Sequence, residues 1–141
     1  MKKRVELSDY RKMQMRMYLK ENADRIREYQ NNYVKDRRRI DPVFSRRMAL
    51  SNALRQAIRL GGYGERSCLY RIIGLPWEEF KIVFENTFYG NMTYDDITTF
   101  EIDHIIPTHT AKSVEELEKL YFWTNLRALT PEDNKKKGRN Y

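Results

Sequence analysis

Cysteine and long apolar runs are scarce in this chain of 141 residues, and both absences exclude classes of protein. The single cysteine, Cys68, excludes an internal disulfide and a four-cysteine zinc site, and it suits a reducing compartment. No run of 18 apolar residues occurs, so we expect no membrane span. The basic start, Met1-Lys2-Lys3-Arg4, lacks the apolar stretch of a secretory signal. We therefore expect a soluble cytoplasmic protein.

Charged residues make up 33% of the chain and are unevenly distributed along it. Residues 1–59 hold 17 Lys/Arg against 7 Asp/Glu, whereas residues 60–134 hold 6 against 13. Residues 135–141 add four more basic side chains and no acidic ones. This pattern predicts a basic arm and tail that contact a polyanion, on either side of an acidic middle that could hold a cation. The alternative is a charged helix that serves only solubility.

Glycine and proline are absent from residues 8–39, where most residues favour helices. Apolar side chains recur there at i, i+3, i+7 spacing in two sets: Tyr10, Met13, Met17 and Ile26, Tyr29, Tyr33. We expect one or two long helices, broken near Asn22 and mostly solvated. Asp41-Pro42 ends this segment, because a residue before proline is disfavoured in a helix. The predicted organisation is an arm of residues 1–41 and a domain of residues 42–141.

The domain begins with three predicted helices, which are separated by glycines. The first covers about residues 45–60 and stops at Gly61-Gly62, and the second covers about residues 69–73 and ends at Gly74. Pro76 opens the third, which carries an aromatic core face of Trp77, Phe80, Phe84 and Phe88. We place Cys68 and Trp123 in the core as well.

Two strands and two helices are predicted to follow a turn-rich connection over residues 86–96. Residues 97–106 favour a strand, and a capping box at Ser113 starts a helix that carries Leu117, Leu120 and Tyr121. Residues 125–129 favour a second strand. Thr130 then caps a last short helix that stops at Gly138. The fold class is α+β: a long basic helical arm, a small helical middle and a C-terminal ββα motif within about residues 97–139.

Polar residues fall at the ends of these C-terminal elements. Asp103 and His104 lie near the end of the first strand, Asn125 starts the second, and Asn134 lies in the last helix. Carboxylate and amide oxygens suit a hard cation such as Mg²⁺ or Mn²⁺. A histidine beside it, with an ordinary pKa of about 6.5, is able to take a proton from water near pH 7. These are the groups that phosphodiester hydrolysis needs.

The segments Phe100-Glu-Ile-Asp-His-Ile-Ile-Pro107, Thr124-Asn-Leu-Arg-Ala-Leu129 and Asn134-Lys-Lys-Lys-Gly138 together resemble the signature of HNH endonucleases. The resemblance is closest to phage-type members without zinc-binding cysteines, and it extends back to about residue 67. It implies a metal-dependent DNA endonuclease with a ββα-metal site. If the protein is phage-encoded, its compartment would be the host cytoplasm.

The resemblance also implies a role for each matched position. His104 would be the general base, Asp103 and Asn134 the metal ligands, and Asn125 a brace that holds His104 through hydrogen bonds to backbone. Lys137 would contact a DNA phosphate. Asparagine rather than histidine at position 134 disfavours zinc, so the expected cofactor is Mg²⁺ or Mn²⁺. Glu101 stands where relatives often carry histidine; on an alternating strand it shares a face with Asp103 and could assist the metal.

Further basic residues are candidate DNA contacts: Lys135, Lys136, Arg139, Arg37, Arg38 and Arg39. Lys135, Lys136 and Lys137 could instead complement a helix C-terminus, and the run Arg37–Arg39 could form a solvated face. His109 is either an exposed loop residue or a group that helps at the phosphate. One such motif cuts one strand per visit, so we expect a monomer to nick DNA; cutting both strands would need a homodimer or two events. The alternatives are a basic DNA- or RNA-binding module with a non-catalytic HNH fold, or an accessory of a phage packaging or recombination assembly.

Overall fold

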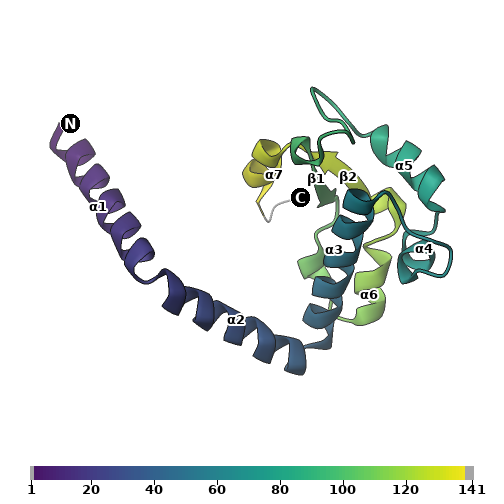
Figure 1. Cartoon of the computed structure of the whole chain (residues 1–141), viewed down its shortest axis with the longest axis horizontal. Coiled ribbons are helices and arrows are strands. Elements are labelled where there is room, and N and C mark those ends of the chain that lie inside the picture. The colour runs from purple at the N-terminus through teal and green to yellow at the C-terminus, as the bar shows by residue number, and fades with distance from the viewer. Residues whose placement is uncertain (1, 139–141) are drawn as a thin grey trace. The chain divides into compact units, whose positions relative to one another are not determined.

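The computed structural model describes the backbone of residues 2–138 and the side chains of residues 8–138. The chain divides into two compact units, Met1–Asp41 and Pro42–Tyr141, and each is described here by itself (Figure 1). The described part is mostly helical and contains a two-stranded antiparallel sheet, in agreement with the predicted α+β class. No helix in the described part of the chain is long and apolar enough to cross a membrane.

The first unit consists of two helices, α1 (Lys2–Glu21) and α2 (Ala23–Ile40). The predicted break near Asn22 is confirmed, and the Asn22 side chain donates a hydrogen bond to the Tyr18 carbonyl at 2.9 Å. None of the described side chains from Ser8 to Asp41 is buried. Packing of apolar area therefore contributes little to this unit, and the helices depend on their favourable residue composition.

The second unit begins with α3 (Pro42–Leu60), α4 (Cys68–Ile73) and α5 (Trp77–Glu85). Helix α3 starts three residues before the predicted position, because proline suits the first position of a helix. Gly74 ends α4 as predicted, with φ +83°, a left-handed conformation that glycine adopts without strain. A Cβ there would also collide with the ring of Phe122. Both the backbone conformation and the space available therefore require glycine at this position.

The sheet pairs β1 (Glu101–His104) with β2 (Leu126–Leu129). The segment between the strands contains α6 (Val114–Lys119), which is capped by the Ser113 side chain as predicted. Helix α7 (Pro131–Lys137) follows β2, is capped by Thr130, and contacts both strands. Its cap and its stop at Gly138 agree with the sequence. The two strands and α7 lie together within the second unit (Figure 1).

The predicted strand over residues 97–106 is too long. Only Glu101–His104 pairs with β2, and Ile97–Thr99 forms a 3-10 turn instead. The side chain of Asp96 accepts hydrogen bonds from the backbone and hydroxyl of Thr98, which offers this segment an alternative to strand pairing. Local turn chemistry therefore outweighs the strand propensity of these residues.

The core of the second unit is built from α3, α4 and α5 packed with residues of the sheet and α6. Its fully buried large side chains are Leu50, Leu54, Ile73, Phe80, Phe84, Leu117 and Tyr121. Placing Cys68 in the core was wrong, because α4 buries Leu69, Ile72 and Ile73 and leaves the cysteine at its start exposed. Trp123 is half-buried against the core, and Phe88 packs there from beyond the end of α5.

Candidate active site

Helix α7 crosses the face of β1 that presents Glu101 and Asp103. The amide nitrogen of Asn134 donates a hydrogen bond to Glu101, and one turn later Lys137 reaches Asp103. Glu101 and Asp103 therefore share a face, as expected from alternation along a strand. The fold brings Asp103 and Asn134 to the same contact between β1 and α7, although 30 residues separate them in the chain.

Asp103 is a buried carboxylate held between two cationic side chains. Its side chain is 7% exposed, and Arg127 Nε donates to Oδ2 at 2.8 Å. Lys137 Nζ lies 2.7 Å from Oδ1 and 2.8 Å from Oδ2, and it also donates to the His104 carbonyl at 2.7 Å. Burial of this carboxylate is tolerable because positive charge and hydrogen bonds compensate it. The site is thus organised to hold positive charge at Asp103.

His104 packs its imidazole against the ring of Tyr121, with centroids 4.5 Å apart and an interplanar angle of 71°. Its Nε2 is buried without a hydrogen-bond partner among the described residues. Nδ1 is not among the buried nitrogens that lack a partner. Burial lowers the pKa of His104 to about 4; the Asp103 charge opposes this shift and Lys137 supports it. The imidazole is therefore neutral near pH 7. Its pKa is lower than the ordinary value of about 6.5 assumed from the sequence, because the ring is largely buried.

Asn125 connects the end of β1 to the segment before β2. Its side-chain oxygen accepts from the Ile106 N–H at 2.8 Å, and its nitrogen donates to the carbonyls of Ile106 at 3.1 Å and Leu120 at 2.8 Å. The backbone contacts predicted for this side chain are present. They fix the chain immediately after His104, and so constrain where the imidazole lies.

Tyr121 and Arg127 are two residues around the site that sequence reasoning missed. Tyr121 is fully buried beneath His104, and its hydroxyl lies 2.7 Å from that of Ser51 on α3. Arg127 stands directly opposite Asp103 in the sheet register. An antiparallel pairing of the two motifs, aligned on their apolar positions, would have placed this opposite-charge pair side by side.

The donor atoms at this site are those that a hard divalent cation prefers. The amide oxygen of Asn134 has no hydrogen-bond partner among the described residues, and the Glu101 carboxylate beside it is exposed. However, no group of three or more His, Cys, Asp or Glu side chains within residues 8–138 is arranged to hold a metal. The oxygen atoms are of the type that binds Mg²⁺ or Mn²⁺. A cation at Asp103 would share the carboxylate with Lys137 or replace its ammonium.

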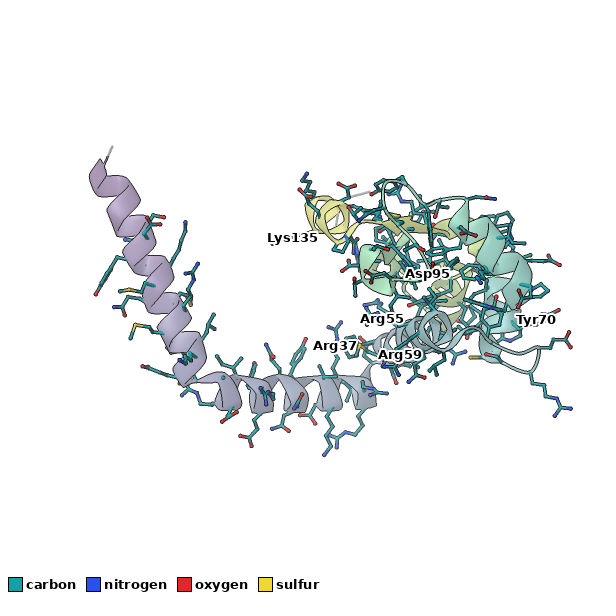
Figure 2. The ribbon with its side chains drawn as sticks, turned by 45° about the horizontal axis from the view of Figure 1, so that its top comes forward. Arg37, Arg55, Arg59, Tyr70, Asp95 and Lys135 are labelled. Carbon is teal, nitrogen blue, oxygen red and sulfur yellow. The ribbon has the colours of Figure 1, made fainter. Side chains whose placement is uncertain are left out.

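The other predicted DNA contacts differ in how accessible they are. Lys135 is exposed on α7 (Figure 2), whereas Lys136 pairs with Glu132 at 3.3 Å. The ammonium of Lys137 is engaged by Asp103 rather than presented outward, so its predicted phosphate contact requires it to leave that carboxylate. His109 is exposed in a 3-10 turn.

The remaining candidates are the arginines at the end of α2 and Arg139. Arg38 and Arg39 are exposed near the end of α2, and Arg37 pairs with Asp41 at 3.5 Å. Arg139 lies outside the described residues. The arm candidates and the β1–α7 site belong to different units.

The chain matches no protein-family model, no curated protein and no solved structure at a significant level. The resemblance to HNH endonucleases therefore depends on the quoted motifs and on the chemistry of this site.

Proposed function

We propose that the second unit is an HNH-type, metal-dependent endonuclease that hydrolyses phosphodiester bonds in DNA. The observation that supports this most directly is the contact between β1 and α7, where Asn134 donates to Glu101 and Lys137 donates to Asp103 and to the backbone carbonyl of His104. Asp103 and His104 lie on β1, which pairs antiparallel with β2, and Asn134 lies on the helix that follows β2; this order of elements supports the proposal.

Each side chain has a definite task in this proposal. Asp103 and Asn134, with help from Glu101, would hold a Mg²⁺ or Mn²⁺ ion, which supplies charge stabilisation at the phosphate when bound. His104 would take a proton from the attacking water, since its imidazole is neutral near pH 7. Asn125 and Tyr121 would keep that imidazole in position, through the backbone after it and through ring contact.

Lys137 would have two successive partners. Its ammonium neutralises Asp103, and a cation held by Asp103 would release it toward the substrate phosphate. The basic arm would add salt-dependent affinity for DNA. With one such site per chain, we expect single-strand nicks from a monomer, and paired cuts only from a homodimer or as part of a larger phage assembly.

A second candidate function is a DNA- or RNA-binding module without catalysis. Two observations favour it: both Asp103 oxygens are already held by Lys137 and one also by Arg127, and Nε2 of His104 is enclosed. If Lys137 stayed on Asp103 permanently, the unit would keep a stable hairpin and have no place for the metal.

A plasmid assay separates the two candidates. Supercoiled DNA is incubated with the full chain in Mg²⁺, in Mn²⁺ and in EDTA, while filter retention measures binding in each buffer. An endonuclease converts supercoiled to relaxed circles with either metal and not in EDTA. Equal retention in all buffers without any relaxed product would favour the binding module.

A further inference from the structure

Helix α3 carries a polar stripe on a different side from its core face. Its buried residues are Leu50, Leu54 and Ala57. Four exposed polar residues recur at i, i+3, i+4 and i+7: Asn52, Arg55, Gln56 and Arg59. Residues at this spacing lie on one side of a helix, so these four side chains form a continuous surface, which we call the α3 stripe.

The α3 stripe forms one wall of a cleft of about 590 Å³. The same cleft is lined by Glu101 of β1 and Asn134 of α7, two of the residues at the candidate metal site. Apolar side chains complete its lining: Ile58, Ile97, Phe100 and Ile102. The cleft thus joins a basic helix surface to the edge of the site where hydrolysis is proposed.

Within the described residues, the two arginines of the α3 stripe have no acidic partner, unlike Arg46, Arg71 and Arg127 of the same unit. Arg46 pairs with Glu118 at 2.8 Å and Arg127 with Asp103 at 2.8 Å. Within the described residues, Arg55 and Arg59 make neither an ion pair nor a hydrogen bond, and both are exposed; Figure 2 labels both on α3. Two guanidinium groups one helical turn apart are therefore available for an anionic ligand.

We propose that the α3 stripe binds the sugar-phosphate backbone of a DNA strand and leads it to the Glu101–Asn134 edge. A guanidinium fork fits a phosphate in a bidentate manner, and the neighbouring amides of Asn52 and Gln56 supply the uncharged contacts that backbone recognition commonly uses. The proposal rests on the proposed endonuclease function for its choice of ligand. It assigns substrate binding to a helix that none of the sequence motifs includes.

The first test measures DNA binding by the full chain in EDTA, where no cleavage can occur. The variant Arg55→Gln/Arg59→Gln removes two charges and keeps length, polarity and helix propensity. The matched control, Arg66→Gln/Lys119→Gln, removes two exposed charges of the same unit that lie outside the cleft and make no ion pair among the described residues. Affinity for a short duplex is recorded at several salt concentrations, with circular dichroism to verify folding.

We expect the stripe variant to bind on the order of tenfold more weakly and to lower the slope of log affinity against log salt by about 1.8, since each phosphate contact contributes about 0.9. The control should change neither quantity by a comparable amount. Equal slopes for the stripe variant and the wild type would overturn the proposal, as would equal losses in the stripe variant and the control.

The second test locates the DNA. An iron chelate that cuts nearby DNA is attached to Gln56→Cys, or to Arg66→Cys as control, in a Cys68→Ser chain, because Cys68 is exposed and would otherwise be labelled too. Cuts confined to a few consecutive nucleotides from position 56, and absent from position 66, support the proposal. Equal cutting from positions 56 and 66 would contradict it. Loss of the cuts from position 56 when an acidic peptide is added, without loss when unlabelled DNA is added, would also contradict it.

The outcomes of these tests are separate from those of the plasmid assay. If the wild type never nicks DNA and the stripe variant binds DNA weakly, the endonuclease proposal fails and the α3 stripe remains a DNA-binding surface. Normal binding by the stripe variant in a protein that does nick would refute only the surface proposed here.

Discussion

Lys137 and Asp103 form an ion pair on which the proposed metal binding would depend. The Lys137 side chain is only 13% exposed and its ammonium approaches both carboxylate oxygens, so positive charge is already present beside Asp103. On the proposed function, a divalent cation would compete with this ammonium for the same lone pairs. Arg127 on the neighbouring strand holds Oδ2 as well, so Asp103 keeps one cationic partner if the other is removed.

Replacement of Lys137 by methionine tests this competition directly. The substitution keeps most of the apolar stem and deletes the charge, so Mn²⁺ should bind the DNA-free protein on the order of tenfold more tightly, about 1.4 kcal/mol. Titration calorimetry measures this. Lys135→Met, an exposed position on the same helix, is the control and should leave Mn²⁺ affinity nearly unchanged. Weaker Mn²⁺ binding in Lys137→Met would show that the lysine supports the metal site.

His104 makes the stability of the metal-free protein depend on pH. Its pKa is lowered to about 4 in the folded state by burial, against about 6.5 in an unfolded chain. The unfolded chain therefore binds the proton more tightly, and stability is lost as pH falls from above 6.5 toward 4. Urea unfolding in EDTA should show a loss of about 2 kcal/mol between pH 7.5 and pH 5 from this residue.

The two histidines of the chain provide a matched pair for this measurement. His104→Gln should reduce the pH-dependent loss, whatever its effect on absolute stability, because the enclosed imidazole is gone. His109→Gln, at an exposed position, should retain the loss seen in the wild type. Identical pH profiles for the two variants would mean that the His104 ring is not enclosed.

At the scale of elements, the β1–β2 pair has only four residue pairs, so side-chain bonds must help to fix it. Asn125 makes three hydrogen bonds to backbone at the point where the chain leaves β1. Truncation would leave the Ile106 N–H and the Leu120 carbonyl without these partners. Such losses are costly where water cannot easily replace them.

Asn125→Ala should therefore lower the free energy of unfolding by about 1–2 kcal/mol, since two of the three bonds lie at exposed positions. Urea denaturation followed by circular dichroism measures the change. Asn52→Ala, at an exposed position in the middle of α3, is the control and should stay within about 0.5 kcal/mol of the wild type. A change in Asn125→Ala no larger than that of the control would show that the brace contributes nothing to stability.

Elements whose ends depend on local chemistry could be predicted from the sequence. Ser113, Thr130 and Gly74 end or begin helices through contacts with their own neighbours in the chain, and the structure has each in that role. The strand over residues 97–106 was predicted too long, because the partner strand decides which residues pair. Cys68 was misplaced because a six-residue helix buries one side only.

In the candidate site, too, features carried by sequence motifs could be predicted, whereas contacts between distant segments could not. The motifs placed Asp103, Asn125 and Asn134 near one another, and the structure has Asp103 and Asn134 at one contact between β1 and α7. The contact of Lys137 with Asp103, the enclosure of His104 by Tyr121 and the cleft beside α3 depend on packing between distant segments. Sequence patterns carry no record of such packing.

At the scale of the whole molecule, charge and chemistry are assigned to different parts of the chain. Residues 1–59 hold 17 of the 27 Lys/Arg, and this stretch includes both the arm and the α3 stripe. The acidic and amide groups of the candidate site follow within residues 101–134. This arrangement suits a protein that binds a polyanion broadly and acts on it at one place.

The central claim is that the protein hydrolyses a DNA strand in the presence of a divalent metal, with His104 as the general base. The most direct measurement is the nicking rate of supercoiled plasmid in Mg²⁺ for the wild type, His104→Ala and His109→Ala, with DNA retention measured in parallel. The account predicts nicking by the wild type and by His109→Ala, and a loss of at least about a hundredfold in His104→Ala with DNA binding retained. Nicking by His104→Ala at the wild-type rate would contradict it.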